Sequence, residues 1–277
     1  MGWLAKSRSR YAEAEQFFKR ALKIKEATFG PDSPGAASAL EGLADVALAR
    51  ADYEDALGFY RKLLPIYEKA YGKDHTRVAW VHAGMGRAFL HQEQYKEAEP
   101  LLHRALEVRE KTLGPEHPTT ASSLAGIAWL NAEQGKFADA QAPYERAFKI
   151  YEKAYGADSR YLPDRLRAVA LVRFAQGQDA ECDRLLQRAL AIDRKQERDG
   201  DVAEAGNFGA RAREAGAQSN YRIAKALYNS ALTAYQSALG PDDPKCVTCL
   251  TNIADIYRHQ GKKTLADFYA RRAALLK

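Results

Sequence analysis

The apolar residues of this chain recur with helical spacing, and no segment shows the two-residue alternation that is typical of a strand. In residues 119–156, Leu124, Ile127 and Leu130 lie on one face of a helix. A turn follows, where Gly135 supplies the left-handed residue that often ends a helix. A second apolar face then begins, formed by Phe137, Ala140, Tyr144, Ala147 and Ile150. This segment is therefore predicted to be a helical hairpin.

The hairpin pattern recurs every 42 residues along the chain. Each predicted second helix carries two small residues seven positions apart, so they share one face and let two helices pack closely. Apart from a leucine at 63, one member of each pair is alanine, in the series Ala21, Leu63, Ala105, Ala147, Ala189, Ala231 and Ala273. The other member follows the series Ala14, Ala56, Ala98, Ala140, Cys182, Ala224 and Ala266. One hairpin cannot bury its apolar face alone, so the units are expected to stack.

Connectors between units carry a stop signal for helices. Glycine followed by proline, which cannot continue a helix, occurs at Gly30-Pro31, Gly114-Pro115 and Gly240-Pro241. A short helical hairpin with small residues at fixed places resembles the tetratricopeptide repeat (TPR). The 42-residue unit with GPxHP connectors resembles the kinesin light chain subgroup, and residues 114–118, 120–128 and 134–137 show this best. The resemblance covers nearly the whole chain and implies an all-α, right-handed superhelical solenoid of antiparallel helix hairpins.

The repeat predicts a single solenoid over residues 1–277 with an N-terminal half repeat at 1–30. Six full hairpins follow, near 35–72, 77–114, 119–156, 161–198, 201–240 and 243–277. Either the chain is a fragment of a longer array, or the half repeat acts as a cap. No polar capping helix follows the last unit, although solenoids normally end on one. Both ends are therefore candidates for self-association.

One first-helix position, residues 199–217, is degenerate because it holds four glycines. Each glycine inside a helix costs about 1 kcal/mol relative to alanine. Two interpretations follow: decay of the repeat, or a hinge at which a partner packs into the space that small side chains leave. Hydrogen exchange separates them, because protection of 201–217 equal to that of 119–134 would exclude a hinge.

In the fold that the resemblance implies, the first helices line a concave groove and expose places two, five, nine and twelve of each unit. In the three middle units these places hold Trp80, Arg87, Leu90, Trp129, Arg167, Leu171 and Phe174. Aromatic residues and arginine dominate binding hot spots. We expect a groove for an extended or helical peptide, with apolar anchors and a carboxylate or carbonyl near the arginines. Packing against neighbouring units is the alternative, and it stays open for Trp129.

The resemblance does not extend to known binding residues. Kinesin light chain repeats, by resemblance, carry asparagine at places five and six of many units, and here only Asn252 remains. The lysine and asparagine set of chaperone-binding repeats is missing as well. Neither a motor-cargo role nor a chaperone role therefore follows from the resemblance.

Catalytic and metal-binding patterns are not found. The pair Cys246 and Cys249 is a lone CxxC, whereas structural zinc needs four ligands, so we interpret it as structural. The sequence contains no P-loop, GxSxG or HExxH motif. Three cysteines do not make a disulfide framework. We therefore predict no catalytic residue, no cofactor and no metal, and we do not expect an enzyme.

Charge and hydropathy narrow the choice of partners. The net charge is +6, but 42 basic and 36 acidic residues are interleaved, which is typical of a solvated helical surface. No basic stripe predicts nucleic-acid binding. No run approaches the ~18 apolar residues of a membrane span. The N-terminus has no apolar core of a signal peptide, which favours the cytoplasm, unless a missing N-terminal segment carries a signal.

Two hypotheses of function remain. The first is a protein-interaction scaffold that binds a segment of a protein or peptide partner in the concave groove. The alternative is a structural subunit of a larger assembly, held through its convex face or its open solenoid ends.

Overall fold

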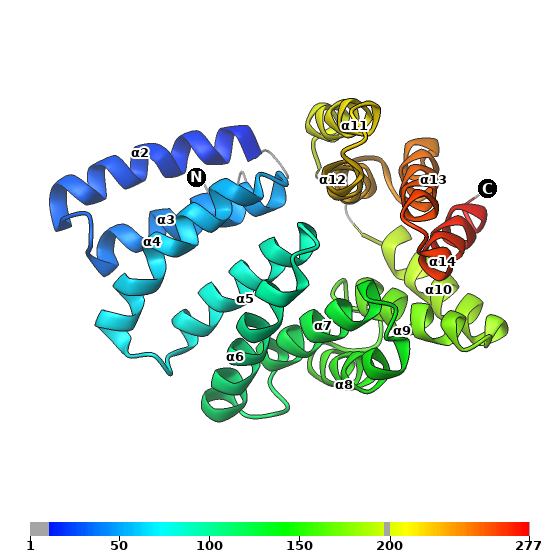
Figure 1. The fold of residues 1–277 in the computed structure, drawn as a ribbon, viewed down its shortest axis with the longest axis horizontal. Coiled ribbons are helices and arrows are strands. Elements are labelled where there is room, and N and C mark those ends of the chain that lie inside the picture. The colour runs from blue at the N-terminus through cyan, green and yellow to red at the C-terminus, as the bar shows by residue number, and fades with distance from the viewer. Residues whose placement is uncertain (1–10, 197–199, 277) are drawn as a thin grey trace. The chain divides into compact units, whose positions relative to one another are not determined.

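The computed structural model describes residues 11–196 and 200–276 of the chain. Within these ranges it consists of thirteen helices and contains no strand (Figure 1). In chain order they are α2 (Tyr11–Phe29), α3 (Pro34–Ala49), α4 (Tyr53–Tyr71), α5 (Thr76–His91), α6 (Tyr95–Leu113), α7 (Pro118–Glu133), α8 (Phe137–Tyr155), α9 (Pro163–Ala175), α10 (Asp179–Arg194), α11 (Val202–Ala217), α12 (Tyr221–Leu239), α13 (Pro244–His259) and α14 (Lys263–Ala274).

The helices pair as hairpins, which confirms the predicted all-α fold. α3 packs on α4, α5 on α6, and so on to α13 on α14. α2 is the second helix of the predicted half repeat, whose residues 1–10 lie outside the described residues. The chain divides into two compact units, unit 1 (Met1–Leu113) and unit 2 (Gly114–Lys277). A single solenoid over the whole chain stays a prediction.

The connectors stop one helix and start the next. Before α7, Gly114 has a φ of 88°, a conformation that glycine adopts without strain. His117 then caps the new helix, because its Nδ1 accepts a hydrogen bond from the backbone N–H of Thr119 at 3.1 Å. Pro118 occupies the first helical turn, where a missing N–H costs nothing. The GPxHP pattern therefore ends one helix, caps the N-terminus of the next and supplies its first residue.

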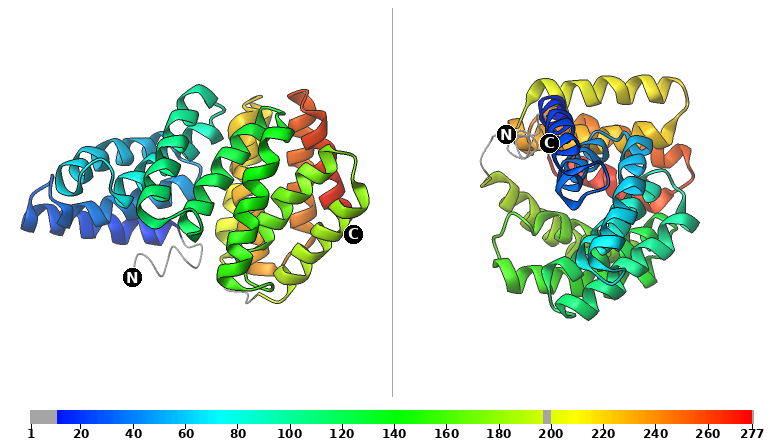
Figure 2. Two further views of the ribbon diagram at one scale, coloured as in Figure 1. Left: turned by 90° about the horizontal axis from the view of Figure 1, so that it is seen from below. Right: turned by 90° about the vertical axis from the view of Figure 1, so that its left-hand side faces the viewer.

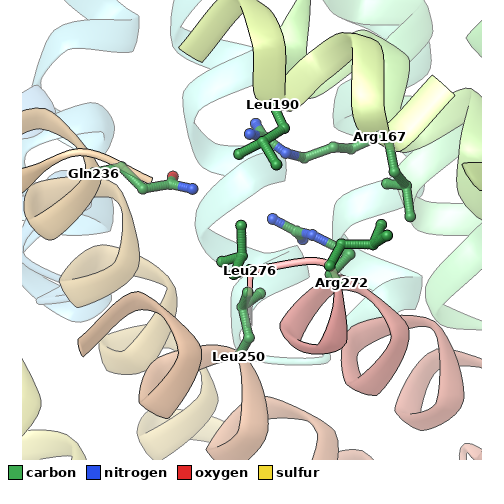
Figure 3. Close-up of a pocket in the computed structure, with 8 residues that line it drawn as sticks. Arg167, Leu190, Gln236, Leu250, Arg272 and Leu276 are labelled. Atoms are coloured by element: carbon green, nitrogen blue, oxygen red, sulfur yellow. The ribbon is translucent and has the colours of Figure 1, made fainter. Parts of the chain in front are cut away.

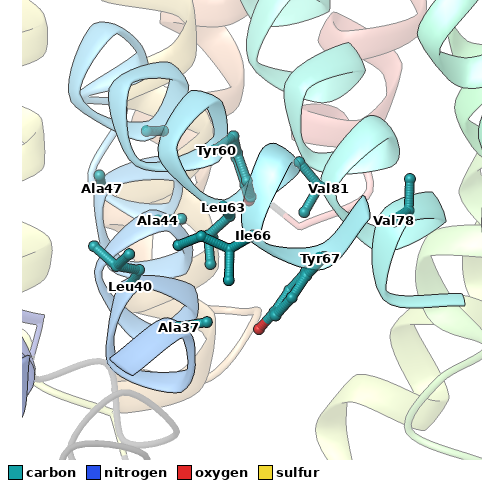
Figure 4. Packing of buried hydrophobic residues seen from close by; sticks show 11 residues of the cluster. Ala37, Leu40, Ala44, Ala47, Tyr60, Leu63, Ile66, Tyr67, Val78 and Val81 are labelled. Atoms are coloured by element: carbon teal, nitrogen blue, oxygen red, sulfur yellow. The ribbon is translucent and has the colours of Figure 1, made fainter. Parts of the chain in front are cut away.

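The core of unit 1 joins three consecutive helices. Small residues on α3, among them Ala37, Ala44 and Ala47, face large residues on α4, and Val78 and Val81 of α5 close the cluster (Figure 4). Tyr60 of α4 and Leu63, the one departure from alanine in its series, are fully buried in this cluster. The small residues of α3 thus make room for the aromatic and aliphatic side chains of α4.

Gly84 of α5 is required by the Tyr60 ring. A Cβ added at Gly84 would lie 2.3 Å from Tyr60 Cζ, well inside van der Waals contact, and the buried ring has little room to move. We expect Gly84→Ala to lower the free energy of unfolding by about 1–3 kcal/mol, because overpacking outweighs the gain in helix propensity. Urea unfolding of the purified chain measures this.

Gly58 of α4 provides the matched control. It is also inside a helix of unit 1, but a Cβ added there meets nothing within 4 Å. Gly58→Ala should therefore raise stability by about 0.5–1 kcal/mol through helix propensity alone. Equal stability of the two alanine variants would refute the close packing of Gly84 on Tyr60.

The degenerate position of unit 2 is helical, because α11 spans Val202–Ala217. Its N-terminus is capped by Asp201, whose Oδ1 accepts from the backbone N–H of Ala203 at 2.8 Å and of Glu204 at 3.2 Å. The glycines therefore do not prevent helix formation. Whether residues 199–217 act as a hinge stays a prediction, and residues 197–199 lie outside the described residues.

Unit 2 does not continue as a regular stack after α10. In a solenoid each repeat contacts only its neighbours. Here α8 packs on α9 and α12 on α13, but no comparable packing joins α10 to α11, both of which are fully described. Instead α14 contacts α9, one hairpin further than expected. Figures 1 and 2 show α14, in red, beside the yellow-green helices α9 and α10. The last hairpin therefore folds back onto the first two hairpins of its unit.

Candidate protein-binding site

The predicted groove residues of unit 1 lie on α5. The Trp80 side chain is half-buried and meets the Tyr60 ring edge-on, with centroids 5.4 Å apart. Arg87 follows two turns later and is exposed. Leu90 is only 2% exposed, so the expectation that it faces solvent is wrong. The reason is its place in the last turn of α5, where the hairpin turn folds α6 back over this end of the helix.

Charges of both signs surround these residues on what we call the α3–α5 face, defined by Glu41, Asp45, Trp80 and Arg87. Burial raises the pKa of the Tyr60 hydroxyl, Arg87 opposes this, and Asp45 adds to it, so both charges act at this point of the face. Glu41 accepts a hydrogen bond from Arg77 at 2.9 Å. The face therefore presents an indole edge, a guanidinium group and carboxylates.

In unit 2, Trp129 belongs to a buried polar network at the end of α7. Its Nε1 donates to Glu133 Oε1 at 3.3 Å. The same carboxylate accepts from the Tyr257 hydroxyl at 2.5 Å and forms ion pairs with Lys225 at 3.2 Å and Lys262 at 3.1 Å. Burial by itself raises the pKa of Glu133, but the two lysines and the tyrosine outweigh it and lower the pKa to about 2. Glu133 is thus a buried, charged link between α7 and the C-terminal helices.

The three predicted residues on α9 are covered by the chain itself. Arg167 forms ion pairs with Asp164 at 3.0 Å and with Asp193. Leu171 is 8% exposed, so the expectation that it faces solvent is also wrong. The Phe174 ring lies 6.1 Å from the ring of Phe268 on α14. The physical reason is the return of α14 onto α9, which periodicity within a repeat does not encode.

Arg271 of α14 holds this contact in place. It donates to both carboxylate oxygens of Asp183 on α10, at 2.5 Å and 2.6 Å, and to Asp179 at 3.1 Å. Its guanidinium carbon also lies 5.7 Å from the centre of the Phe174 ring. Hydrogen bonding to Arg271 lowers the pKa of Asp183 below its ordinary value. Bidentate pairs of this kind are geometrically specific as well as strong.

The neighbouring Arg272 has the opposite environment. It extends with Arg167 into a small cavity of about 30 Å³, also lined by Gln236 and by Leu186, Leu190, Leu250, Leu275 and Leu276 (Figure 3). Within the described residues, no carboxylate accepts a hydrogen bond from Arg272, and its guanidinium lies 5.1 Å from the Tyr269 ring centre. Burial and the charge of Arg167 lower the pKa of Arg272 to about 10.

Sequence reasoning missed Glu133, Lys225, Lys262 and Arg271. One signal was available for Glu133. In the other units its place holds small residues or histidine, namely Ala49, His91, Ala175, Ala217 and His259. A carboxylate at such a place is costly unless it is paired. Its partners lie 92 to 129 residues away in the sequence, so no local pattern identifies them.

The cysteines have the properties of packing residues. Cys182, Cys246 and Cys249 are free and buried. Burial raises the pKa of Cys182 to about 11 and that of each of the other two to about 12. A protonated thiol is neither a nucleophile nor a good metal ligand. In the described ranges no cluster of three or more histidine, cysteine or acidic side chains is placed to hold a metal ion.

Among the described residues, no helix is both long enough and apolar enough to span a bilayer.

The sequence model of the tetratricopeptide repeat matches residues 4–69, 52–102, 77–153 and 212–274. These matches cover more than half of the chain. The chain belongs to the tetratricopeptide repeat family. The unmatched stretch of this TPR protein contains α9 and α10, the hairpin after which the regular stacking ends.

Solved structures share the fold at low sequence identity. A Rap protein complexed with Competence and Sporulation Factor is 15% identical, with a TM-score of 0.64 over 99% of this chain and 72% of that chain. Aspartyl phosphate phosphatase F from Bacillus subtilis is 16% identical, with a TM-score of 0.59 over 99% and 68%. BtubC (BKLC) from P. vanneervenii is 15% identical, with a TM-score of 0.53 over 96% and 90%. No curated protein matches the chain.

Proposed function

We propose that this TPR protein is an interaction scaffold that binds a segment of another protein on the α3–α5 face. One observation carries the proposal: Arg87 is exposed and Trp80 half-buried on the same side of one helix, two turns apart. Aromatic residues and arginine supply most of the binding energy in many interfaces. The rest of the TPR hairpin is a rigid support for them.

The chemistry of the α3–α5 face defines the segment it fits. An apolar side chain of the partner would pack beside the Trp80 ring. A carboxylate or a backbone carbonyl would accept hydrogen bonds from Arg87, and donors would meet Glu41 and Asp45. An extended or helical peptide satisfies this pattern. The Rap protein complexed with Competence and Sporulation Factor supports the proposal, because it shows that a chain of this fold can hold a second molecule.

The test is a double substitution, Trp80→Ala with Arg87→Ala. Affinity purification with quantitative mass spectrometry from the source cell should recover the partners of the unaltered chain at least tenfold less well. The matched control is Arg61→Ala with Lys62→Ala, two exposed residues of α4 in the same unit, which should leave recovery unchanged. Equal recovery of the same partners by both variants would rule out the α3–α5 face. Far-UV circular dichroism checks that both variants fold.

As an alternative, we propose a structural subunit that associates through α2, the first described helix. On α2, Ile24 is 58% exposed and Phe29 is 61% exposed, although side chains of this size are usually buried. We expect sedimentation velocity to show self-association that rises with concentration. Ile24→Glu should abolish it, because a charge in an apolar contact is costly. A monomer at every concentration would exclude this route.

A further inference from the structure

One surface of unit 2 combines an aromatic ring with acidic groups on three helices. We call it the inner face and define it by Glu133 of α7, Phe174 of α9, and Asp179 and Asp183 of α10. Phe174 is half-buried, and the Arg271 guanidinium that lies 5.7 Å from its ring centre also donates to Asp179 and Asp183. Hydrogen bonding and ion pairing lower the pKa values of Glu133 and Asp183, so both stay ionised over the physiological range.

The chain covers the inner face with basic and aromatic groups of its own. Lys262 meets Glu133, Phe268 meets Phe174, and Arg271 meets both aspartates. Phe268 and Arg271 stand three positions apart on α14, so they project from one side of the helix. At these contacts, acidic groups on the receiving side face basic groups on the occupying side.

We propose that the inner face is a binding site for a basic amphipathic helix of a partner protein, which competes with the chain's own α14 for it. The proposal rests on the scaffold function proposed above. The partner helix would carry an aromatic residue followed three positions later by arginine or lysine. The resident α14 then acts as an internal occupant that must leave before the partner binds.

Three features of the closure favour such an exchange. First, α14 contacts α9 without the regular stacking that joins α12 to α13, so release of α14 from the inner face can leave that repeat interface in place. Second, Arg272 faces Arg167 across a cavity that stays unfilled when α14 packs on α9 and α10. Third, α14 reaches Phe174, Asp179 and Asp183 through the side chains of Phe268 and Arg271. A helix of the same chemistry from another protein can make the same contacts.

The experiment uses the full chain and a fluorescein-labelled synthetic peptide of residues 261–276 as a surrogate for the partner helix. The unaltered chain should bind it weakly, because its own α14 is in place. The variant Arg271→Ala weakens only the internal occupant and leaves the inner face intact. It should bind the peptide at least tenfold more tightly by fluorescence anisotropy.

Exchanging the charges of the Arg271–Asp183 pair tests whether the peptide binds at the inner face. A peptide carrying Arg271→Asp should bind the Arg271→Ala chain at least tenfold less well than the natural peptide. Adding Asp183→Arg to that chain should reverse the preference, because the ion pair is restored with opposite signs. Asp183 is partly exposed, so this change is compatible with folding. Circular dichroism of each variant confirms that it is folded.

Several outcomes would overturn the proposal. They are equal peptide affinity of the unaltered and Arg271→Ala chains, no binding to either, and no reversal of preference in the Asp183→Arg chain. Trp80→Ala with Arg87→Ala separates this proposal from the scaffold site on unit 1. That variant should leave peptide binding unchanged, whereas loss of peptide binding would place the peptide on the α3–α5 face instead.

Discussion

Replacement of Glu133 by glutamine should lower the free energy of unfolding of unit 2 by about 3–5 kcal/mol. The carboxylate side chain is 4% exposed and its partner Lys225 is 6% exposed, so both charges are removed from water. A glutamine can still accept from the Tyr257 hydroxyl, but it removes the negative charge that Glu133 places 3.2 Å from the buried Lys225 ammonium. Breaking a buried ion pair from one side costs more than the pair contributes, because the remaining charge is uncompensated.

Hydrogen exchange read over residues 244–276 measures this effect within unit 2. The matched control is Glu116→Gln, which removes an exposed carboxylate from the connector before α7. That change should alter stability by less than about 0.5 kcal/mol. A loss below about 1 kcal/mol for Glu133→Gln would show that the network does not hold the last hairpin against α7.

The same carboxylate gives unit 2 a defined pH dependence. The pKa of Glu133 is lowered from an ordinary value of 4.5 to about 2 in the folded chain. A group with a lowered folded pKa contributes stability that is present above its unfolded pKa and is lost as the pH falls through its folded pKa. The shift corresponds to about 3 kcal/mol. Unfolding measured between pH 5 and pH 2 should therefore be steeper for the unaltered chain than for Glu133→Gln.

The sequence was sufficient to predict the hairpins. Their signals are local: helical spacing of apolar residues, a glycine that ends one helix, and a proline that follows it. The cap at His117 is local in the same way, because it contacts a backbone N–H two residues further on. The small residues that recur seven positions apart on the second helices predicted that neighbouring hairpins stack. Family membership was predictable for the same reason.

The cover of the inner face could not be predicted. Lys262 and Glu133 are 129 residues apart, and Arg271 and Asp183 are 88 apart. Such pairs have no period, so a repeat pattern describes each helix correctly and says nothing about a hairpin that folds back. Its place in the repeat put Phe174 on the side of α9 that α14 contacts. The repeat pattern, however, predicted that this side faces solvent or a partner. That any of the named groove residues binds a partner stays a prediction.

Arg271 and Arg272 are adjacent, and substitution by methionine should change stability in opposite directions. Arg271→Met removes a bidentate ion pair with Asp183 and should lower the free energy of unfolding by about 1–3 kcal/mol. Arg272→Met should raise it by about 1–3 kcal/mol. The reason is that Arg272 is desolvated beside Arg167, whereas methionine fits the leucine-lined cavity without a charge.

A double-mutant cycle identifies the cause of the gain. If repulsion from Arg167 destabilises Arg272, most of the gain from Arg272→Met should disappear in an Arg167→Met background. Urea unfolding of the four chains gives the coupling free energy directly. A loss of stability for Arg272→Met would mean that its contact with Tyr269 outweighs the repulsion. If Arg272→Met raises stability equally in the Arg167→Met background, the destabilising effect of Arg272 comes from its desolvation alone.

The cavity lies between α9–α10 and α12–α14. The gain in stability from Arg272→Met should therefore also slow hydrogen exchange of the last hairpin and weaken binding of the 261–276 peptide.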